Sequence, residues 1–70
     1  MEQNIKTPKF PKLEGVLASR GLSYPVVAKG IGMGDQAFRR RMSGEANFTL
    51  DEILELCFFL NCNFSEIFGD

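Results

Sequence analysis

The stretch LSYPVVAKGIGMGDQAFRRRMSG, residues 22–44, decides the fold of this 70-residue chain. Its apolar spacing predicts one helix over residues 24–30 and another over residues 35–43. Ser23 is expected to cap the first of these helices. Gly32 suits the left-handed conformation that a sharp turn between helices requires. The stretch therefore predicts a helix-turn-helix.

The second of these helices, residues 35–43, is expected to have a buried side and an exposed side. At about 100° per residue, Phe38 and Met42 fall together on the apolar side. The opposite side is polar and carries Gln36, Arg39, Arg40 and Ser43. An exposed helix face of this kind fits the major groove of DNA, which is about 12 Å wide and admits a helix.

The polar side chains on that face have a chemistry that suits DNA. Arginine donates two hydrogen bonds to guanine O6 and N7, glutamine pairs with adenine N6 and N7, and arginine also binds phosphate. We expect Gln36 and Arg39 to contact base edges and Arg40 to contact either a base or a phosphate. Ser43 belongs to the same predicted surface. The alternative interpretation is that the arginine run is only a solvated surface.

Three nearby residues have less obvious roles. Asp35 either caps the helix, since an acid is favoured at a helix N-terminus, or accepts a hydrogen bond from cytosine N4. Tyr24 either offers its hydroxyl to a phosphate or is a half-buried aromatic side chain. Arg41 falls toward the buried side of its helix, so its stem is expected to lie along apolar surface with the guanidinium in solvent.

Further signals place this motif within one all-α domain. Residues 1–9 are expected to form a flexible arm, and residues 10–70 a single helix-turn-helix domain. A helix is predicted over residues 11–20. A capping box, TLDE, opens a helix at residues 49–60, and a second box, NFSE, opens a final turn at residues 63–68. The sequence thus predicts five short helices without a strand.

The buried faces of these helices are harder to assign. In the first helix of the motif and just after it, the residues expected to be buried are Val26, Val27 and Ile31. The helix over residues 49–60 is more apolar than one buried face requires. Its expected core residues are Leu50, Ile53, Leu54, Cys57 and Phe58. The other apolar side chains either form an exposed interface patch or lie under the last helix. They are Leu56, Phe59, Leu60, Phe64 and Phe68.

The charges are segregated along the chain. All eight lysines and arginines lie between Lys6 and Arg41, whereas the residues from Met42 onward include acids and no base. The net charge of −1 by itself argues against a nucleic-acid partner. Because phosphate responds to the local field rather than to the total charge, the segregation favours such a partner.

Several function classes lack their usual residues. With no histidine in the chain, no catalytic group, metal site or cofactor site is predicted. The glycine run GIGMG follows no strand, so it does not indicate a nucleotide-binding loop. Cys57 and Cys62 are expected to be reduced core or interface residues. No apolar run is long enough to span a membrane and the start lacks a signal peptide, so a cytoplasmic location is expected.

At these residues the chain resembles the lambda-repressor-like (Cro/CI-type, Xre-like) helix-turn-helix family, over about residues 12–68. The matching positions are Leu22, Ser23, Ala28, Gly32, Met33, Phe38, Met42 and Gly44. Downstream, FTLDEI and NFSEIF are similar to the fourth and fifth helices of small phage and prophage regulators. The resemblance implies a five-helix domain that docks its third helix in the major groove, usually as a dimer.

The resemblance also assigns individual positions. Asp35, Gln36, Arg39 and Arg40 match slots that face bases and phosphates. Tyr24 takes a slot where a glutamine often contacts phosphate.

The leading hypothesis is a sequence-specific DNA-binding transcriptional regulator, a repressor of phage or mobile-element type. A homodimer would read half-sites about 34 Å apart on double-stranded DNA. The alternative hypothesis is a protein-binding module, either an antirepressor or modulator that binds a partner regulator, or an antitoxin of the same fold. Its motivation is the acidic, phenylalanine-rich second half of the chain.

Overall fold

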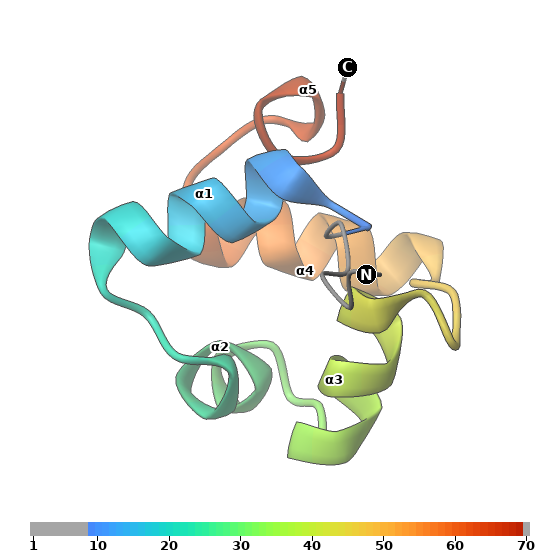
Figure 1. Ribbon diagram of the computed structural model, residues 1–70. Coiled ribbons are helices and arrows are strands. Elements are labelled where there is room, and N and C mark those ends of the chain that lie inside the picture. Colours follow the sequence, from blue (N-terminus) through green and yellow to red (C-terminus); the bar gives the residue numbers. More distant parts are fainter. Residues whose placement is uncertain (1–8, 70) are drawn as a thin grey trace, which may run out of the picture.

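The computed structural model describes residues 9–69, which form five helices and no strand (Figure 1). In chain order the helices are α1 (Pro11–Arg20), α2 (Tyr24–Gly30), α3 (Asp35–Ser43), α4 (Leu50–Leu60) and α5 (Phe64–Ile67). The predicted all-α class and the expected positions of the helices are confirmed. The predicted arm, except for Lys9, lies outside the described residues.

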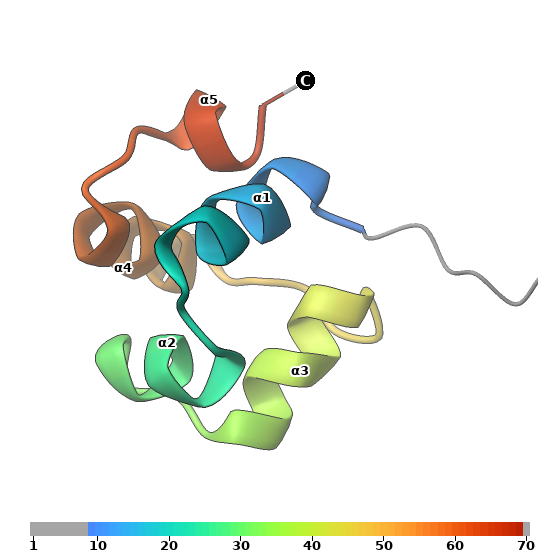
Figure 2. The ribbon, with the colours of Figure 1, turned by 60° about the vertical axis from the view of Figure 1, so that its left-hand side comes forward.

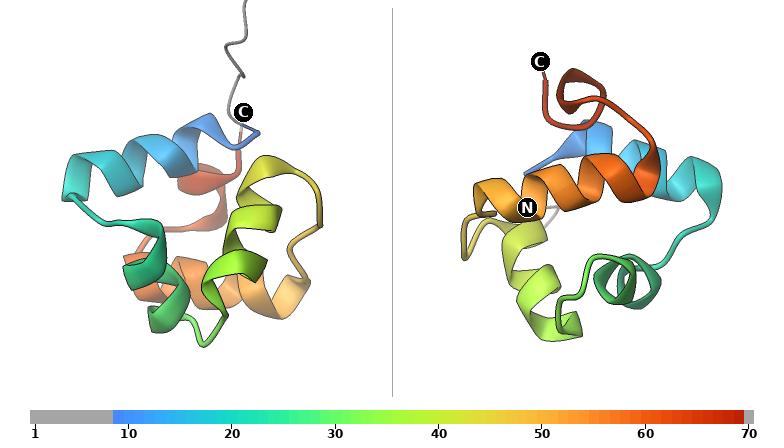
Figure 3. Two further views of the ribbon diagram at one scale, coloured as in Figure 1. Left: turned by 60° about the horizontal axis from the view of Figure 1, so that its bottom comes forward. Right: turned by 180° about the vertical axis from the view of Figure 1, so that it is seen from behind.

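The helices are arranged in three levels. The pair α1 and α4 lies in the middle, with α5 on one side and the α2–α3 pair on the other (Figure 2). The short helix α5 packs against both α1 and α4, and α2 packs against α3. The view from behind in Figure 3 shows the same order, with α4 in front of α1. This arrangement leaves α3 at the edge of the molecule.

Local hydrogen bonds explain where α4 and α5 begin. The Thr49 side chain accepts from the backbone N–H of Glu52 at 3.2 Å, and the Glu52 carboxylate accepts from the Thr49 N–H at 2.9 Å. Asn63 and Glu66 form the same reciprocal pair at 3.0 and 2.7 Å. Both predicted capping boxes are therefore confirmed. Ser23 is the N-cap residue of α2, as predicted, and has extended backbone there, but its side chain makes no capping hydrogen bond.

The turn between α2 and α3 depends on one glycine. Gly32 has a φ of +74°, in the left-handed region that costs other residues energy. With the chain reversed there, the N–H of Met33 donates to the Ala28 carbonyl at 2.8 Å and closes the end of α2. The tight connection fixes how α3 leaves α2.

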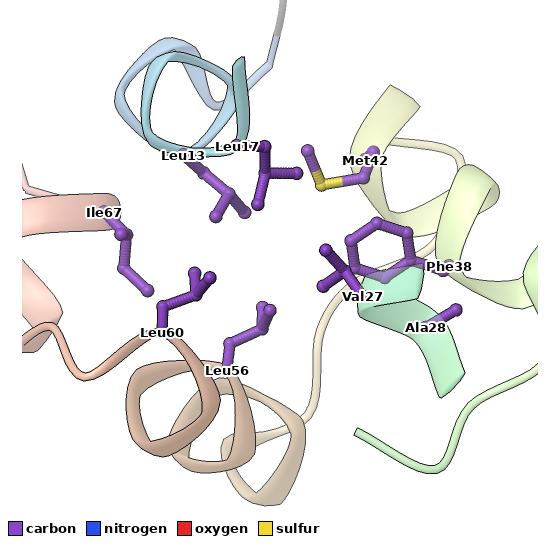
Figure 4. Packing of buried hydrophobic residues seen from close by; sticks show 9 residues of the cluster. All are labelled: Leu13, Leu17, Val27, Ala28, Phe38, Met42, Leu56, Leu60 and Ile67. Carbon is purple, nitrogen blue, oxygen red and sulfur yellow. The ribbon is translucent and has the colours of Figure 1, made fainter. Parts of the chain in front are cut away.

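One hydrophobic core joins all five helices. Figure 4 shows its side chains converging on a shared space from the surrounding helices. The buried residues are Leu13, Leu17, Val27, Ala28, Phe38, Met42, Leu56, Leu60 and Ile67. Each helix contributes at least one of them, so none of the five helices is stabilised by its own hydrogen bonds alone.

The face of α4 that points into the core is shifted from the predicted one, of which Ile53 and Cys57 are half-buried. Leu56 and Leu60 are fully buried, whereas Leu50, Leu54 and Phe58 are exposed. The prediction failed because α4 is apolar on nearly every side, so periodicity alone could not choose between its faces. Of the residues for which the sequence left an exposed patch and a covered position open, Leu56 and Leu60 are buried in the core, whereas Phe59 and Phe64 are 39% and 55% exposed.

The neighbouring helices add two further details. Val27 is buried and Ile31 is half-buried, but Val26 points outward, which corrects the expectation for Val26.

Phe59 is only partly exposed because Gly30 has no side chain. A Cβ on Gly30 would collide with the Phe59 ring, which lies against the end of α2.

Aromatic contacts connect α5 to the rest of the core. The Phe68 ring lies 5.2 Å from that of Phe10 and 5.6 Å from that of Phe48, centroid to centroid. Phe48 also lies 6.1 Å from Phe38 in α3. Edge-on pairs of this kind stabilise a core beyond the area that they bury. Phe68 therefore packs inside the fold, in agreement with the alternative that the last helix covers α4.

The two faces of α4 should differ sharply in their effect on stability. Leu56→Ala leaves a cavity in the core and should lower the free energy of unfolding by about 2–5 kcal/mol. The matched change Leu54→Ala on the exposed face should alter it by no more than about 0.5 kcal/mol. Urea unfolding followed by circular dichroism measures both values. Equal losses in the two variants would contradict the assigned orientation of α4.

Candidate nucleic-acid interface

The two sides of α3 lie as the sequence predicts. Phe38 is completely buried and Met42 is 3% exposed. Gln36, Arg39, Arg40 and Ser43 are all exposed on the solvent side. Because consecutive helical residues are about 100° apart, burial of Phe38 and Met42 turns the intervening Arg39 and Arg40 away from the core. The predicted polar face therefore exists as one surface.

Arg39 is held over its neighbours without being buried. Its Nε lies 3.7 Å from the Asp35 carboxylate one turn earlier in α3, and the two side chains are 59% and 49% exposed. The guanidinium carbon lies 5.6 Å from the centre of the Tyr24 ring. Exposed ion pairs of this kind contribute roughly 0–1 kcal/mol, so the pair orients Arg39 but does not lock it.

Tyr24 is bonded inside the fold. Its ring packs edge-on against Phe38 at 5.3 Å, and its hydroxyl donates to the Glu14 carboxylate of α1. Burial and then the hydrogen bond to Glu14 raise the pKa of Tyr24 to about 12, while Arg39 acts in the opposite direction. A phosphate is a hydrogen-bond acceptor, so it could accept the hydrogen bond of this hydroxyl only by replacing Glu14. The geometry thus favours Tyr24 as a support for α3 and Arg39.

The other polar residues of α3 differ in how they are engaged. Gln36 and Arg40 are exposed, and the side chain of neither forms a hydrogen bond with another residue within 9–69. The Ser43 hydroxyl donates to the Arg40 carbonyl at 3.0 Å at the end of the helix. Asp35 is the first residue of α3 and pairs with Arg39, as described above.

Arg41 corrects the expectation that its guanidinium lies in solvent. Its Nε donates to the Glu52 carboxylate at 2.8 Å, and its Nη1 donates to the Ala37 carbonyl at 3.1 Å. The Arg41 and Glu52 side chains are only 21% and 23% exposed. The same Glu52 caps α4, so this ion pair joins the side of α3 to the start of α4. Sequence reasoning missed it because the two partners belong to different helices.

The pKa of Glu52 reflects this arrangement. Partial burial pulls it upward, but the hydrogen bond from the Thr49 backbone and the pairing with Arg41 together outweigh that effect. The pKa of Glu52 therefore lies below its ordinary value of 4.5. A lowered carboxylate pKa means that folding favours the charged form.

Two more basic side chains are used to hold the fold together. Arg20, at the end of α1, donates to the Leu60 carbonyl at the end of α4, and its second nitrogen lies 3.4 Å from the Cys62 sulfur. Lys12 donates to the Ser65 carbonyl in α5 at 3.0 Å. With Arg41, these residues tie the basic half of the chain to its acidic half. Part of the segregated positive charge therefore stabilises the fold. The arginines that remain on the outer face of α3 are Arg39 and Arg40.

The two cysteines are half-buried and form no disulfide with each other. Burial, followed by the proximity of Cys62, raises the pKa of the Cys57 thiol. This shift disfavours the reactive thiolate at Cys57.

Comparison with known families identifies the family of the chain. A family model described as the Cro/C1-type HTH DNA-binding domain matches residues 12–70. The chain belongs to this family, and DNA binding through a helix-turn-helix is the class of function that fold and family together support. Domains of this family are typically not enzymes. No curated protein and no solved structure matched the chain.

None of the described helices has both the length and the apolar character needed to cross a membrane.

Titration of the single tyrosine tests the environment of Tyr24. Phenolate absorbance of the folded protein should give a midpoint near 12, compared with about 10 in denaturant. Glu14→Gln should move the folded midpoint only part of the way back, because burial is the larger cause of the shift. A folded midpoint at the ordinary tyrosine value would contradict the bond to Glu14.

The Arg41–Glu52 pair should contribute to stability only while Glu52 is charged. A double-mutant cycle with Arg41→Gln and Glu52→Gln should give a coupling free energy of about 0.5–3 kcal/mol near neutral pH. Because the pKa of Glu52 is lower in the folded protein, this stability is fully present above pH 4.5. It is lost as the pH falls through the pKa that Glu52 has in the folded protein. Urea unfolding at several pH values measures the coupling, and a coupling that does not change with pH would refute the assignment.

Proposed function

We propose that this protein is a sequence-specific transcriptional regulator that reads double-stranded DNA with α3 in the major groove. The supporting observation is the two-sided character of α3. Phe38 and Met42 fix its inner side, while Gln36, Arg39 and Arg40 extend from its outer side in a chain of a DNA-binding family. An amphipathic helix anchored in this way presents its polar side chains at a fixed orientation.

Each side chain of the outer face of α3 can contact a different part of the DNA. In this proposal Arg39 contacts guanine, Gln36 contacts adenine, and Arg40 contacts a base or a phosphate. Ser43, at the end of the helix, contacts the DNA backbone. A bidentate arginine–guanine contact contributes about 1–3 kcal/mol to discrimination, more than the exposed Asp35–Arg39 pair is worth. Arg39 can therefore leave Asp35 when DNA is present.

The regulator would act as a repressor by covering a promoter. Two copies would occupy half-sites about 34 Å apart on a near-palindromic operator and exclude polymerase. This mode of action, the phage or mobile-element setting, the homodimer and the cytoplasmic location are parts of the proposal that rest on the sequence. Operator selection from random DNA would supply the sites needed to test them.

A second candidate function is favoured by a separate observation. The acidic second half of the chain exposes Leu50, Leu54 and Phe58 on α4, an apolar surface for which DNA recognition by α3 has no use. A modulator, antirepressor or antitoxin that binds a protein would use such a surface. DNA binding and protein binding are compatible here, because the two surfaces lie on different helices.

Loss of the two outer arginines should weaken DNA binding without unfolding the protein. After selection of an operator, Arg39→Ala and Arg40→Ala should each reduce affinity, and the double variant should also lower the slope of log Kd against log salt by about 1 for each lost phosphate contact. Lys12→Ala, which removes the same charge beside α5, is the matched control and should change affinity little. Unchanged affinity and salt slope in the double variant would end the proposal.

A further inference from the structure

An uncovered apolar surface runs along the outer side of α4. Leu50, Leu54 and Phe58 are 70%, 57% and 86% exposed. Residues four apart lie on the same face of a helix, so these side chains form one line, here called the α4 stripe. In the right-hand view of Figure 3, α4 crosses the front of the molecule and no other helix lies over it. A continuous line of exposed apolar side chains, unlike scattered single ones, is typical of an interaction site.

The border of the α4 stripe is acidic. Asp51 and Glu55 are exposed and follow Leu50 and Leu54 in the chain, so both lie along one side of the stripe. No lysine or arginine occurs after Arg41 in the sequence, and Arg41 is paired with Glu52 on another side of α4. The acidic border is therefore not neutralised by the chain's own second half.

This charge pattern selects the kind of partner. DNA and anionic membrane surfaces would be repelled by Asp51 and Glu55. A second copy that pairs α4 against α4 brings no basic side chain to meet these acids, and in an antiparallel pairing the two acidic borders would face each other. The complementary surface is apolar at its centre and basic at its edge.

We propose that the α4 stripe binds a partner protein through a helix whose apolar residues, spaced four apart, are bordered by lysine or arginine. Packing of Leu50, Leu54 and Phe58 against such a helix would supply most of the affinity, and Asp51 and Glu55 would select the basic border. This inference goes beyond DNA recognition by α3 and rests on the second candidate function, protein binding, for which it names the kind of partner. It does not depend on DNA recognition, since none of the residues involved belongs to α3.

Binding of designed helical peptides to the whole protein tests the proposal. Two peptides carry the same leucine spacing, one bordered by lysine and the other by glutamate, and a third scrambles the lysine peptide so that its leucines no longer share a face. Fluorescence anisotropy should show binding of the lysine peptide only. Phe58→Gln should weaken this binding at least about tenfold, because Phe58 is the largest and most exposed side chain of the stripe and a few large anchors carry most of the affinity of an interface.

Matched variants separate this surface from the DNA-binding surface. The charge reversal Asp51→Lys/Glu55→Lys should transfer preference to the glutamate peptide. Arg39→Ala/Arg40→Ala should leave peptide binding unchanged, and Phe58→Gln should leave operator binding and thermal stability unchanged. Equal binding of the scrambled peptide, equal binding of the glutamate peptide, or no binding of any peptide would overturn the proposal. So would self-association in analytical ultracentrifugation that Phe58→Gln abolishes, since the occupant would then be a second copy.

Discussion

Burial of Phe38 is the contact on which the rest of the structure depends. Its ring lies between those of Tyr24 and Phe48, so α3 is attached at once to α2 and to the loop before α4. Together with Met42 it fixes the rotation of α3 about its own axis. Because a helix is a rigid rod with a fixed angle between residues, the direction of Arg39 and Arg40 follows from the burial of Phe38.

Electrostatic contacts divide the basic residues into two groups with different roles. Arg20, Lys12 and Arg41 each connect a residue of the first half of the chain to a carbonyl or carboxylate of the second half. These bonds are partly buried or made at helix ends, where carbonyl groups lack partners within the helix. Arg39 and Arg40 remain exposed on α3, which explains how a chain with a net negative charge can still present a basic surface.

The molecule consequently has two surfaces of opposite character. The outer side of α3 is polar and basic, and the outer side of α4 is apolar with an acidic border. They belong to different helices, and the core that lies between α1, α3 and α4 holds both in place. The proposed DNA-binding and protein-binding surfaces therefore share no residue.

The sequence by itself determined the local structure: the helix positions, the turn at Gly32, the capping boxes and the two sides of α3, since caps, glycines and a clear amphipathic pattern act over a few residues. Only the tertiary structure decided which face of α4 is buried, because Leu54 and Leu56 are equally apolar and the choice depends on what α1 and α5 present to them. The bonds of Tyr24 to Glu14 and of Arg41 to Glu52 were likewise decided by packing. Their partners lie in different helices, and the distance between helices is not encoded in any short stretch of sequence.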